Sequence, residues 1–376
     1  MLKSVTIENF FSFGEAQKIE LNPGVNILIG INGSGKSNFI RAIRLLPLLS
    51  DNEFTKVFLQ KWGGFDNVAF DNRNDDLPIH ITYEYDANLI KKHLDNTFIP
   101  PNFYYELKIF KSGNKNYRLE AENYILDKTS QKKTILKEKS DFESIFNLSN
   151  ATNDLPFYIN ALSNYLKNIR YYENFDVSEK SDLRNPGDSF IEDYLLPDGI
   201  NLYNLLNDLN INHASAFEEI ENQLRDVNPY FKNIISKPIG SKFLYYLKEK
   251  ELQKAIDFLF ISTGTLQYLL TLTIFYNPNR GKSILFDEPD PFLHPDMING
   301  IAKGIKHAAN TGTQMIVATH SPLLLNSYDF EDLIIFEKDH KNQTIIAAVS
   351  DETIDKWADY PVGQVWMSGN LGGMRW

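Results

Sequence analysis

One stretch of the chain combines glycines, a lysine and a serine at the spacing of a phosphate-binding loop. The pattern G-x-x-x-x-G-K-[ST] is matched at every required position by Gly30-Ile31-Asn32-Gly33-Ser34-Gly35-Lys36-Ser37. The glycines let successive backbone N–H groups point at phosphate oxygens. Lys36 would supply charge for the β and γ phosphates, and Ser37 would offer its hydroxyl to Mg²⁺. The sequence therefore predicts a nucleotide site.

Two adjacent carboxylates end an apolar segment in the last third of the chain. The segment reads Ser283-Ile284-Leu285-Phe286-Asp287-Glu288-Pro289. Without a phosphate loop, such an ending would be only the exit of a strand into a turn. With one, Asp287 suits the water shell of Mg²⁺, and Glu288 is placed to orient or deprotonate an attacking water.

A histidine follows the next apolar segment, thirty-three residues after Asp287. His320 ends the run Met315-Ile316-Val317-Ala318-Thr319-His320. Such a histidine alone would be read as a surface group, but at the end of the adjacent strand it could contact the γ-phosphate or its water. Lys36 and Asp287 are 251 residues apart, far more than a compact βαβ core requires, so a large insertion is expected.

A serine and a glycine open a helix upstream of the carboxylates, in Ile261-Ser262-Thr263-Gly264-Thr265-Leu266. Ser262 fits a helix N-cap. A second interpretation is that Ser262, the backbone of Gly264 and the helix N-terminus bind the γ-phosphate of an ATP held by another subunit. Both interpretations stay open from the local sequence.

The elements that must position these residues follow from apolar patterning. Short strands are expected at residues 5–7, 18–21 and 25–29, and Pro47 is expected to limit the helix after the loop. A β-like pattern covers about 57–136, and a polar helical pattern covers about 141–254. The last third alternates again, with helices near 264–276 and 297–309 and strands at 283–286, 315–318, 333–336 and 344–349.

The composition of the chain disfavours several classes of protein and of functional site. The 376 residues carry 38 Lys+Arg against 49 Asp+Glu, a net charge of −11 that disfavours a generally basic nucleic-acid sleeve but allows a local basic groove. The absence of cysteine excludes disulfides, thiolate metal sites and cysteine nucleophiles. No signal-peptide pattern or membrane-length apolar run is found, so a cytoplasmic enzyme without a membrane partner is expected.

Taken together, these motifs resemble the ABC-type ATPases of the SMC, RecF and OLD-like group within the AAA family. The resemblance covers the first sixty residues and about 258–338. It is carried by Ile7-Glu8-Asn9-Phe10-Phe11-Ser12-Phe13, Asn32-Gly33-Ser34-Gly35-Lys36-Ser37-Asn38, Asp287-Glu288-Pro289, Leu293-His294-Pro295 and Ala318-Thr319-His320-Ser321-Pro322.

This resemblance implies a role for each motif. Gly30 to Ser37 would be the Walker A loop, Asp287 Walker B, Glu288 the catalytic base and His320 the switch histidine. Ser262 and Gly264 match the signature motif but depart from its commoner Ser-Gly-Gly-Gln form. The candidate cofactor-binding residues are Gly30, Asn32, Gly33, Ser34, Gly35, Lys36, Ser37, Asn38, Ser262 and Gly264, and the candidate metal contacts are Ser37, Asp287 and Gln60.

Two of the features that the resemblance implies can also be interpreted as ordinary structural elements without a function. Residues 290–294 occupy the place of the D-loop, which crosses the dimer interface in this group, but they also read as a proline-rich turn. Gln60 matches the place of the Mg²⁺-contacting glutamine, but it also reads as an exposed polar residue. Because such heads hydrolyse ATP as pairs that enclose two nucleotides, a homodimer or larger assembly is implied.

The expected fold is α/β, a P-loop NTPase of the ABC/SMC-head type with a β-rich lobe and a helical insertion between the two halves of the head. The predicted boundaries are 1–60 for the Walker A half, 61–140 for the β-rich lobe, 141–254 for the helical insertion, 255–350 for the second half and 351–376 for a Trp/Gly-rich tail. The cofactors implied are ATP and Mg²⁺.

The functional hypothesis is an ATPase switch in a bacterial anti-phage defence complex. The chain resembles small ATPases of the OLD-like branch, many of which are encoded beside nucleases or Toprim-fold effectors in such systems. The 56 residues after His320 are too few for a Toprim nuclease domain, so a nuclease or toxin would act in trans. The alternative is a RecF/SMC-like DNA-binding ATPase of repair or recombination. A transporter cassette is disfavoured by the long insertion and the tail.

Two further regions have open interpretations. Trp357, Trp366 and Trp376 could dock an effector or pack internally. The lysine run of Lys128, Lys132, Lys133, Lys137 and Lys139 reads as a solvated face rather than a phosphate contact. Glu337 and Asp339 read as turn charges rather than metal ligands.

Overall fold

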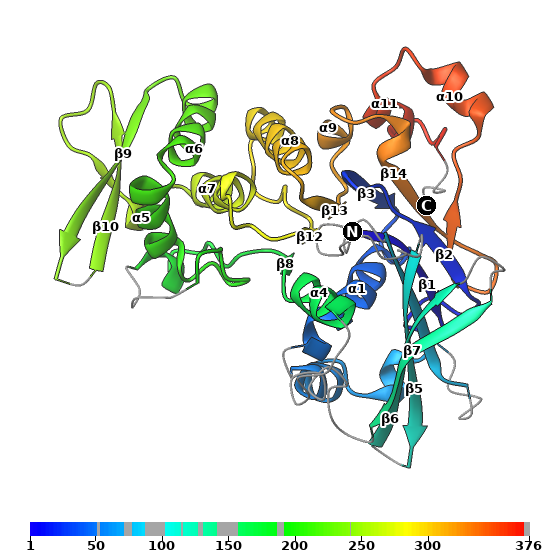
Figure 1. Ribbon diagram of the computed structural model, residues 1–376. Coiled ribbons are helices and arrows are strands. Elements are labelled where there is room, and N and C mark those ends of the chain that lie inside the picture. The colour runs from blue at the N-terminus through cyan, green and yellow to red at the C-terminus, as the bar shows by residue number, and fades with distance from the viewer. Residues whose placement is uncertain are drawn as a thin grey trace. The chain divides into compact units, whose positions relative to one another are not determined.

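The computed structural model describes residues 1–50, 53–70, 77–86, 102–113, 116–126, 131–140, 157–185, 192–240 and 242–371 (Figure 1). The chain divides into two compact units. Unit 1 comprises Met1–Ile169, Leu333–Lys356 and Gly369–Trp376, and unit 2 comprises Arg170–Asp332 and Trp357–Ser368.

The largest sheet of unit 1 is antiparallel, with strand order β2-β1-β4-β5-β6-β7. Alternation along β5 buries Phe103, Tyr105, Leu107 and Ile109 while the residues between them face outward, so one face of the sheet forms the core. The strands are β1 (Leu2–Glu8), β2 (Gln17–Glu20), β4 (Ile79–Asp86), β5 (Asn102–Ser112), β6 (Asn116–Leu126) and β7 (Lys132–Ser140).

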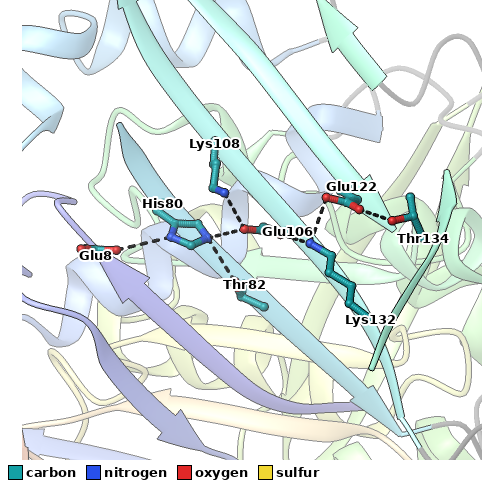
Figure 2. Close-up of polar contacts among 8 residues, drawn as sticks. All are labelled: Glu8, His80, Thr82, Glu106, Lys108, Glu122, Lys132 and Thr134. Atoms are coloured by element: carbon teal, nitrogen blue, oxygen red, sulfur yellow. Dashed lines mark hydrogen bonds and ion pairs between the residues drawn. The ribbon is translucent and has the colours of Figure 1, made fainter. Parts of the chain in front are cut away.

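The other face of this sheet carries a charged network that crosses five strands (Figure 2). His80 lies at its centre, with Nε2 2.8 Å from Glu106 Oε1 and Nδ1 3.3 Å from Glu8 Oε2. Lys132 donates to Glu106 at 2.8 Å and to Glu122 at 2.9 Å. The network therefore links β1, β4, β5, β6 and β7 through side chains as well as through the backbone ladder.

This network also accounts for part of the lysine run. Lys132 is paired as above, and Lys139 lies 3.2 Å from Glu120. The side chain of Lys137 is exposed, while Lys128 and the side chain of Lys133 lie outside the described residues. Where this run can be described, its charges lie among glutamates of the neighbouring strands.

A second set of strands in unit 1 leads to the phosphate loop. β14 (Leu333–Lys338) pairs parallel with β3 (Val25–Gly30) and antiparallel with β15 (Thr344–Ala347). Helix α1 (Lys36–Ser50) follows β3 after the loop. The expectation that Pro47 ends this helix is wrong, because α1 continues through it to Ser50. The buried leucines of the last turns offset the lost backbone hydrogen bond.

The expected β pattern begins later than the sequence suggests. Residues 53–70 form short helical elements instead, namely π-helix η1 (Lys56–Lys61) and α2 (Phe65–Val68). Phe54 and Phe58 stack with ring centroids 5.1 Å apart and bury their apolar surface at helical spacing. Unit 1 also includes α4 (Phe157–Leu166), which precedes β8 (Ile169–Tyr172).

The α/β part of unit 2 contains a parallel strand pair, β12 (Ser283–Asp287) and β13 (Gln314–Ala318). Apolar residues fill both strands, as expected of strands covered on both faces. Helix α7 is buried on all sides from Leu266 onward and packs against α8, where Gly300 and Gly304 leave room for Tyr268 and Phe275. The helices are α7 (Thr263–Tyr276), α8 (Pro295–Asn310) and α9 (Pro322–Leu325).

The range 141–254, for which only helices are expected, also contains strands. Helices α5 (Leu202–Asn212) and α6 (Ala214–Val227) pack beside a hairpin of β9 (Phe231–Ile239) and β10 (Lys242–Glu249), to which β11 (Ile256–Asp257) adds (Figure 1). Buried and exposed residues alternate along parts of β9 and β10, as is typical of strands with one buried face. Lysines between the apolar residues make this range polar overall, which is why the sequence predicts helices instead. Residues 141–156 lie outside the described residues.

The C-terminal segment forms two short helices, α10 (Asp351–Trp357) and α11 (Val362–Met367). In unit 2, α11 packs on α9, and the N–H of Gly363 donates to Asn326 Oδ1 at 3.0 Å. Trp357 contacts the ring of Tyr360, and Trp357 and Trp366 are half-buried, whereas Trp376 lies outside the described residues. None of the helices described is long and apolar enough to cross a membrane.

Candidate functional site

The phosphate loop lies between the end of β3 and the start of α1, in unit 1. Its three glycines adopt positive φ angles, 147° at Gly30, 77° at Gly33 and 117° at Gly35. A Cβ on Gly35 would collide with the side chain of Thr344, and one on Gly30 would collide with a backbone carbonyl of β14. The loop conformation therefore requires glycine at these two positions.

The lysine of the loop is buried and curled back on the loop itself. Lys36 Nζ donates to the carbonyl oxygens of Gly30, at 2.9 Å, and Ile31, at 3.2 Å. Ser34 Oγ is buried and has no hydrogen-bond partner among the described residues. A glycine-rich loop with a lysine ammonium and an unsatisfied hydroxyl fits a phosphate group, which would accept from both.

Two residues outside the motif brace the loop. Thr344 Oγ1, on β15, lies 2.7 Å from the carbonyl oxygen of Ser34 and 2.7 Å from Ser12 Oγ. Asn38 Nδ2 donates to Ser12 Oγ at 2.8 Å. Sequence reasoning missed Ser12 and Thr344 as site residues, because no spacing rule marks them and the contacts of Thr344 bridge more than three hundred residues.

The remaining predicted residues of unit 1 differ in their surroundings. Asn32 and Gly33 are exposed at the tip of the loop, and Ser37 is half-buried at the start of α1. Gln60 has an exposed side chain in the π-helical turn η1, and its assignment to the metal stays a prediction. The described structure thus brings residues 30–38 together as one half-site.

The second half-site lies in unit 2, where β12 ends. Asp287 is the last residue of the strand, and Glu288 follows with a φ of 57°, unusual for a residue other than glycine. The N–H of Glu288 donates to the carbonyl oxygen of Ala318 at 2.9 Å, so the adjacent strand holds this strained backbone in place. The half-site is built on strand ends rather than on a free loop.

His320, the predicted switch histidine, lies close to Glu288, the predicted catalytic base. His320 Nε2 lies 3.6 Å from Glu288 Oε1, and both side chains are partly exposed, 32% for His320 and 42% for Glu288. At this distance the pair forms a loose electrostatic contact rather than a tight hydrogen bond. Both groups therefore remain open to solvent and to a ligand.

A third carboxylate, that of Asp290, supports this half-site, and the sequence analysis did not assign it any chemistry. Asp290 Oδ1 accepts from Thr319 Oγ1 at 2.9 Å, and the same hydroxyl oxygen accepts from the N–H of Ser321 at 2.9 Å. Burial raises the pKa of Asp290, and the charge of Glu288 adds to that effect while the bond from Thr319 opposes it. These contacts fix the chain on both sides of His320.

The start of α7 carries the predicted signature residues. Ser262 is the N-cap, and its Oγ accepts from the N–H of Thr265 at 3.1 Å. A Cβ on Gly264 would lie 2.8 Å from the carbonyl oxygen of Phe292, so the segment 290–294 passes directly over this glycine. Phe292 itself holds a φ of 65° and is 70% exposed. The N-cap interpretation of Ser262 thus accounts for its local contacts.

The oxygen donors suit a hard cation. Ser37 and Asp287 offer a hydroxyl and a carboxylate, and Mg²⁺ typically takes only one or two protein ligands besides phosphate and water. No cluster of three His, Asp or Glu side chains arranged for a metal occurs in the part of the chain that the structure describes. The donor set therefore fits a nucleotide-bound Mg²⁺ rather than an all-protein metal cage.

The family is decided by a match that covers most of the chain. Residues 25–326 match the family model described as "AAA domain, putative AbiEii toxin, Type IV TA system". The chain belongs to this AAA family. The expected α/β fold of the ABC/SMC-head type is confirmed by solved structures, which at low sequence identity show the fold alone.

Two such structures are SMC heads. The SmcHead bound to the C-winged helix domain of ScpA gives a TM-score of 0.56 at 16% identity, covering 93% of this chain and 98% of that chain. The Smc head domain with an extended coiled coil bound to the C-terminal domain of ScpA from Pyrococcus furiosus gives 0.55 at 13% identity, covering 95% and 98%.

Curated relatives match only over short segments. The chromosome partition protein Smc of Desulfitobacterium hafniense is 54% identical over 43 residues, which is 11% of this chain and 4% of that protein. The DNA replication and repair protein RecF of Caldanaerobacter subterraneus is 45% identical over 47 residues, 12% of this chain and 13% of that protein. These similarities and the family match identify an AAA ATPase domain of the ABC/SMC/RecF type.

Proposed function

We propose that this ATPase domain binds ATP at residues 30–37 and hydrolyses it to ADP and phosphate with Glu288 as the base. The observation that carries the proposal is the phosphate loop, which combines glycines at positive φ with buried Lys36 and the unsatisfied hydroxyl of Ser34. The glycines of the loop hold positive φ angles, and such a backbone lets successive N–H groups converge on phosphate oxygens.

The chemical step divides between the two half-sites. Lys36 leaves its carbonyl partners and pairs with the β and γ phosphates, and the backbone N–H groups of the loop hold the phosphate oxygens. The carboxylate of Glu288 takes a proton from water as the water oxygen bonds to the γ-phosphorus and the bond to the ADP oxygen breaks. His320 donates a hydrogen bond to the γ-phosphate or to the water.

Mg²⁺, when bound, would neutralise the charge that develops on the phosphate oxygens. Ser37 and Asp287 would hold it, directly and through water. Gln60 is a further proposed contact, since π-helical turns such as η1 often occur at functional segments.

We further propose that two copies pair around ATP, with Ser262 and the backbone of Gly264 approaching the γ-phosphate of the partner's nucleotide. The exposed N-terminus of α7 supports this role, because a helix N-terminus favours anions. Ser262→Arg should leave ATP binding by the monomer intact and prevent pairing. If Ser262→Arg hydrolyses ATP as fast as the unaltered protein, Ser262 does not act as a signature residue.

The biological role proposed is a nucleotide-driven switch in an anti-phage defence complex, acting on a nuclease or toxin in trans. The family description, which names a toxin of a type IV toxin–antitoxin system, favours this role. The test is the size of the complex isolated from the native host with Glu288→Gln, with and without ATP. Co-purification of a second gene product supports the switch, and a bare ATP-dependent dimer opposes it.

A second candidate is a DNA-repair or recombination ATPase that acts alone. The local similarity to RecF and Smc favours it. Stimulation of hydrolysis by DNA in the purified chain, with no protein partner present, would select this candidate over the switch.

A further inference from the structure

The tripeptide Ile-Asn-Gly occurs twice in the chain, as Ile31-Asn32-Gly33 in the phosphate loop and as Ile298-Asn299-Gly300 in helix α8. No other asparagine of the sequence is followed by glycine. Asparagine is chemically labile, and its side-chain amide reacts most readily with the backbone nitrogen of a following glycine, which has no side chain to obstruct the approach. The two copies therefore place the same reactive pair in two different backbone conformations.

The copy in the phosphate loop lies in an exposed turn. The N–H of Ser34 donates to the carbonyl oxygen of Ile31 at 3.1 Å, and Gly33 holds a φ of 77°, as the third residue of a type II turn does. Asn32 and Gly33 are exposed, and apart from its chain neighbours no atom lies within 4 Å of the Cβ position of Gly33. Among the described residues, neither the Asn32 side chain nor the N–H of Gly33 has a hydrogen-bond partner. Both reacting groups are therefore accessible and unrestrained by hydrogen bonds.

The copy in α8 is restrained by the helix. Past the first turn of an α-helix, each N–H donates to the carbonyl oxygen four residues earlier, and Gly300 lies past that turn. A helical side chain also leans toward the N-terminus of the helix, away from the backbone nitrogen that follows it. Gly300 is buried against Tyr268, whereas Asn299 is exposed. Since Asn32 and Asn299 both face solvent, the backbone conformation is what distinguishes the two copies.

We propose that Asn32 is a site of spontaneous deamidation, which forms isoaspartate and prevents the phosphate loop from binding nucleotide. The nitrogen of Gly33 loses its proton to a solvent base and bonds to Cγ of Asn32, while the Cγ–Nδ2 bond breaks and the amide group takes a proton from water and leaves as ammonia. Water then opens the resulting succinimide ring. Attack at the main-chain carbonyl carbon breaks its bond to the Gly33 nitrogen, so the chain continues through Cβ and Cγ as isoaspartate. Attack at Cγ yields ordinary aspartate.

Isoaspartate changes the loop in both length and charge. It adds a methylene group to the main chain and leaves a carboxylate beside it. The loop has little room for the extra atom, because Gly30 lies against a backbone carbonyl of β14 and Gly35 lies against the side chain of Thr344. The N–H groups between these two glycines must therefore shift, and the new carboxylate repels phosphate. The loss of nucleotide binding rests on the proposed function of the loop, whereas the modification itself does not.

A bound nucleotide slows this reaction. In the proposed complex the backbone N–H groups of the loop, that of Gly33 among them, donate to phosphate oxygens. A nitrogen held in this way is no longer available to attack the side chain of Asn32. The empty loop is therefore the form that is modified, and occupancy by ATP preserves it.

The test incubates the full chain in warm, mildly alkaline buffer, with and without a non-hydrolysable ATP analogue and Mg²⁺. Peptide mass spectrometry with electron-transfer fragmentation then locates isoaspartate and distinguishes it from aspartate. Without nucleotide, Asn32 should be converted roughly tenfold faster than Asn299, the built-in control that also follows an isoleucine. With the analogue, conversion at Asn32 should slow at least about threefold. In urea, where both copies are unfolded, the two rates should be similar.

A second readout connects the modification to the loop. The number of ATP-binding sites per chain, measured by isothermal titration, should fall in proportion to the isoaspartate found at Asn32. Equal conversion of Asn32 and Asn299 in the folded chain would overturn the proposal, and so would isoaspartate at Asn32 with an undiminished number of ATP-binding sites. Failure of the fresh chain to bind ATP would count against the proposed function alone, because the conversion rates of the two copies still decide the chemical step.

Discussion

The two half-sites differ in how firmly their side chains are held. In unit 1, the phosphate loop is fixed by glycine conformations, by Lys36 bonds to backbone carbonyls and by the brace of Thr344. In unit 2, the backbone at Glu288 is fixed, but its carboxylate and His320 are partly exposed and 3.6 Å apart. In the proposed function, phosphate binds to a preformed loop, whereas Glu288, the proposed base, needs a ligand or a second copy to position its carboxylate.

The largest expected effect concerns the preformed half-site. Lys36→Ala should weaken ATP binding by about 10- to 100-fold, because a charged hydrogen bond typically contributes 1.5–3 kcal/mol. Isothermal titration with ATP and Mg²⁺ measures this loss. Lys36→Met, which keeps the buried stem, serves as the control for packing, and unchanged affinity in both variants would contradict the loop's role.

The charged network around His80 and Glu106 on the large sheet of unit 1 gives the next prediction. Hydrogen bonds from His80, and then from Lys108 and Lys132, hold the pKa of Glu106 well below its usual range. Glu106→Gln should therefore destabilise the fold by roughly 1–3 kcal/mol at neutral pH, because it leaves charged partners around a neutral amide. Chemical denaturation followed by circular dichroism measures the difference.

The same network predicts a direction with pH. Since the folded pKa of Glu106 is lowered, its stabilisation is present above the ordinary glutamate pKa of 4.5 and is lost as pH falls toward the folded value. The unaltered protein should lose stability more steeply than Glu106→Gln below about pH 5. Parallel curves in this range would show that the network carries no net stabilisation.

A smaller effect is expected from the brace of the loop. Thr344→Val keeps the shape of the side chain but removes the hydroxyl that contacts Ser34 and Ser12. We expect ATP affinity to fall by roughly three- to tenfold, in line with about 1 kcal/mol for a neutral hydrogen bond. The matched control is Thr353→Val, on helix α10, which has no buried residue. Equal ATP affinities for the unaltered protein, Thr344→Val and Thr353→Val would show that the Thr344 hydroxyl does not support ATP binding.

The smallest effect is expected at Asp290, two residues after the proposed base. Burial raises the pKa of Asp290, so its ionised form costs stability that grows as pH rises from the unfolded to the folded pKa. Asp290→Asn keeps an acceptor for Thr319 and should raise the melting temperature by about 1–4 °C at pH 7. A lower melting temperature would mean that the charge itself is needed for packing.

Part of this architecture could be predicted from local sequence. The phosphate loop, the strands ending at Asp287 and Ala318 and the buried helix beginning after Ser262 follow from glycine spacing and apolar runs, because neighbours in sequence decide them. The confirmed family assignment rests on the same motifs.

Other features depend on partners distant in sequence. Thr344 reaches the loop from the far end of the chain, and the strain at Glu288 depends on a bond to Ala318. Helix α1 continues through Pro47 because burial of its apolar face outweighs the low helix propensity of proline. The lysines of β9 and β10 give these strands a polar sequence that resembles that of a solvent-exposed helix, so the hairpin was not predicted. These outcomes depend on tertiary packing, which spacing rules do not include.

The central claim is that one half-site binds ATP and the other turns it over. The direct test measures ATP affinity and phosphate release for the unaltered protein, Lys36→Ala and Glu288→Gln side by side. The account predicts that Glu288→Gln binds ATP as tightly as the unaltered protein but releases phosphate at least 100-fold more slowly, whereas Lys36→Ala loses binding. Glu288→Gln that loses affinity as Lys36→Ala does, or that still hydrolyses ATP at the original rate, would contradict it.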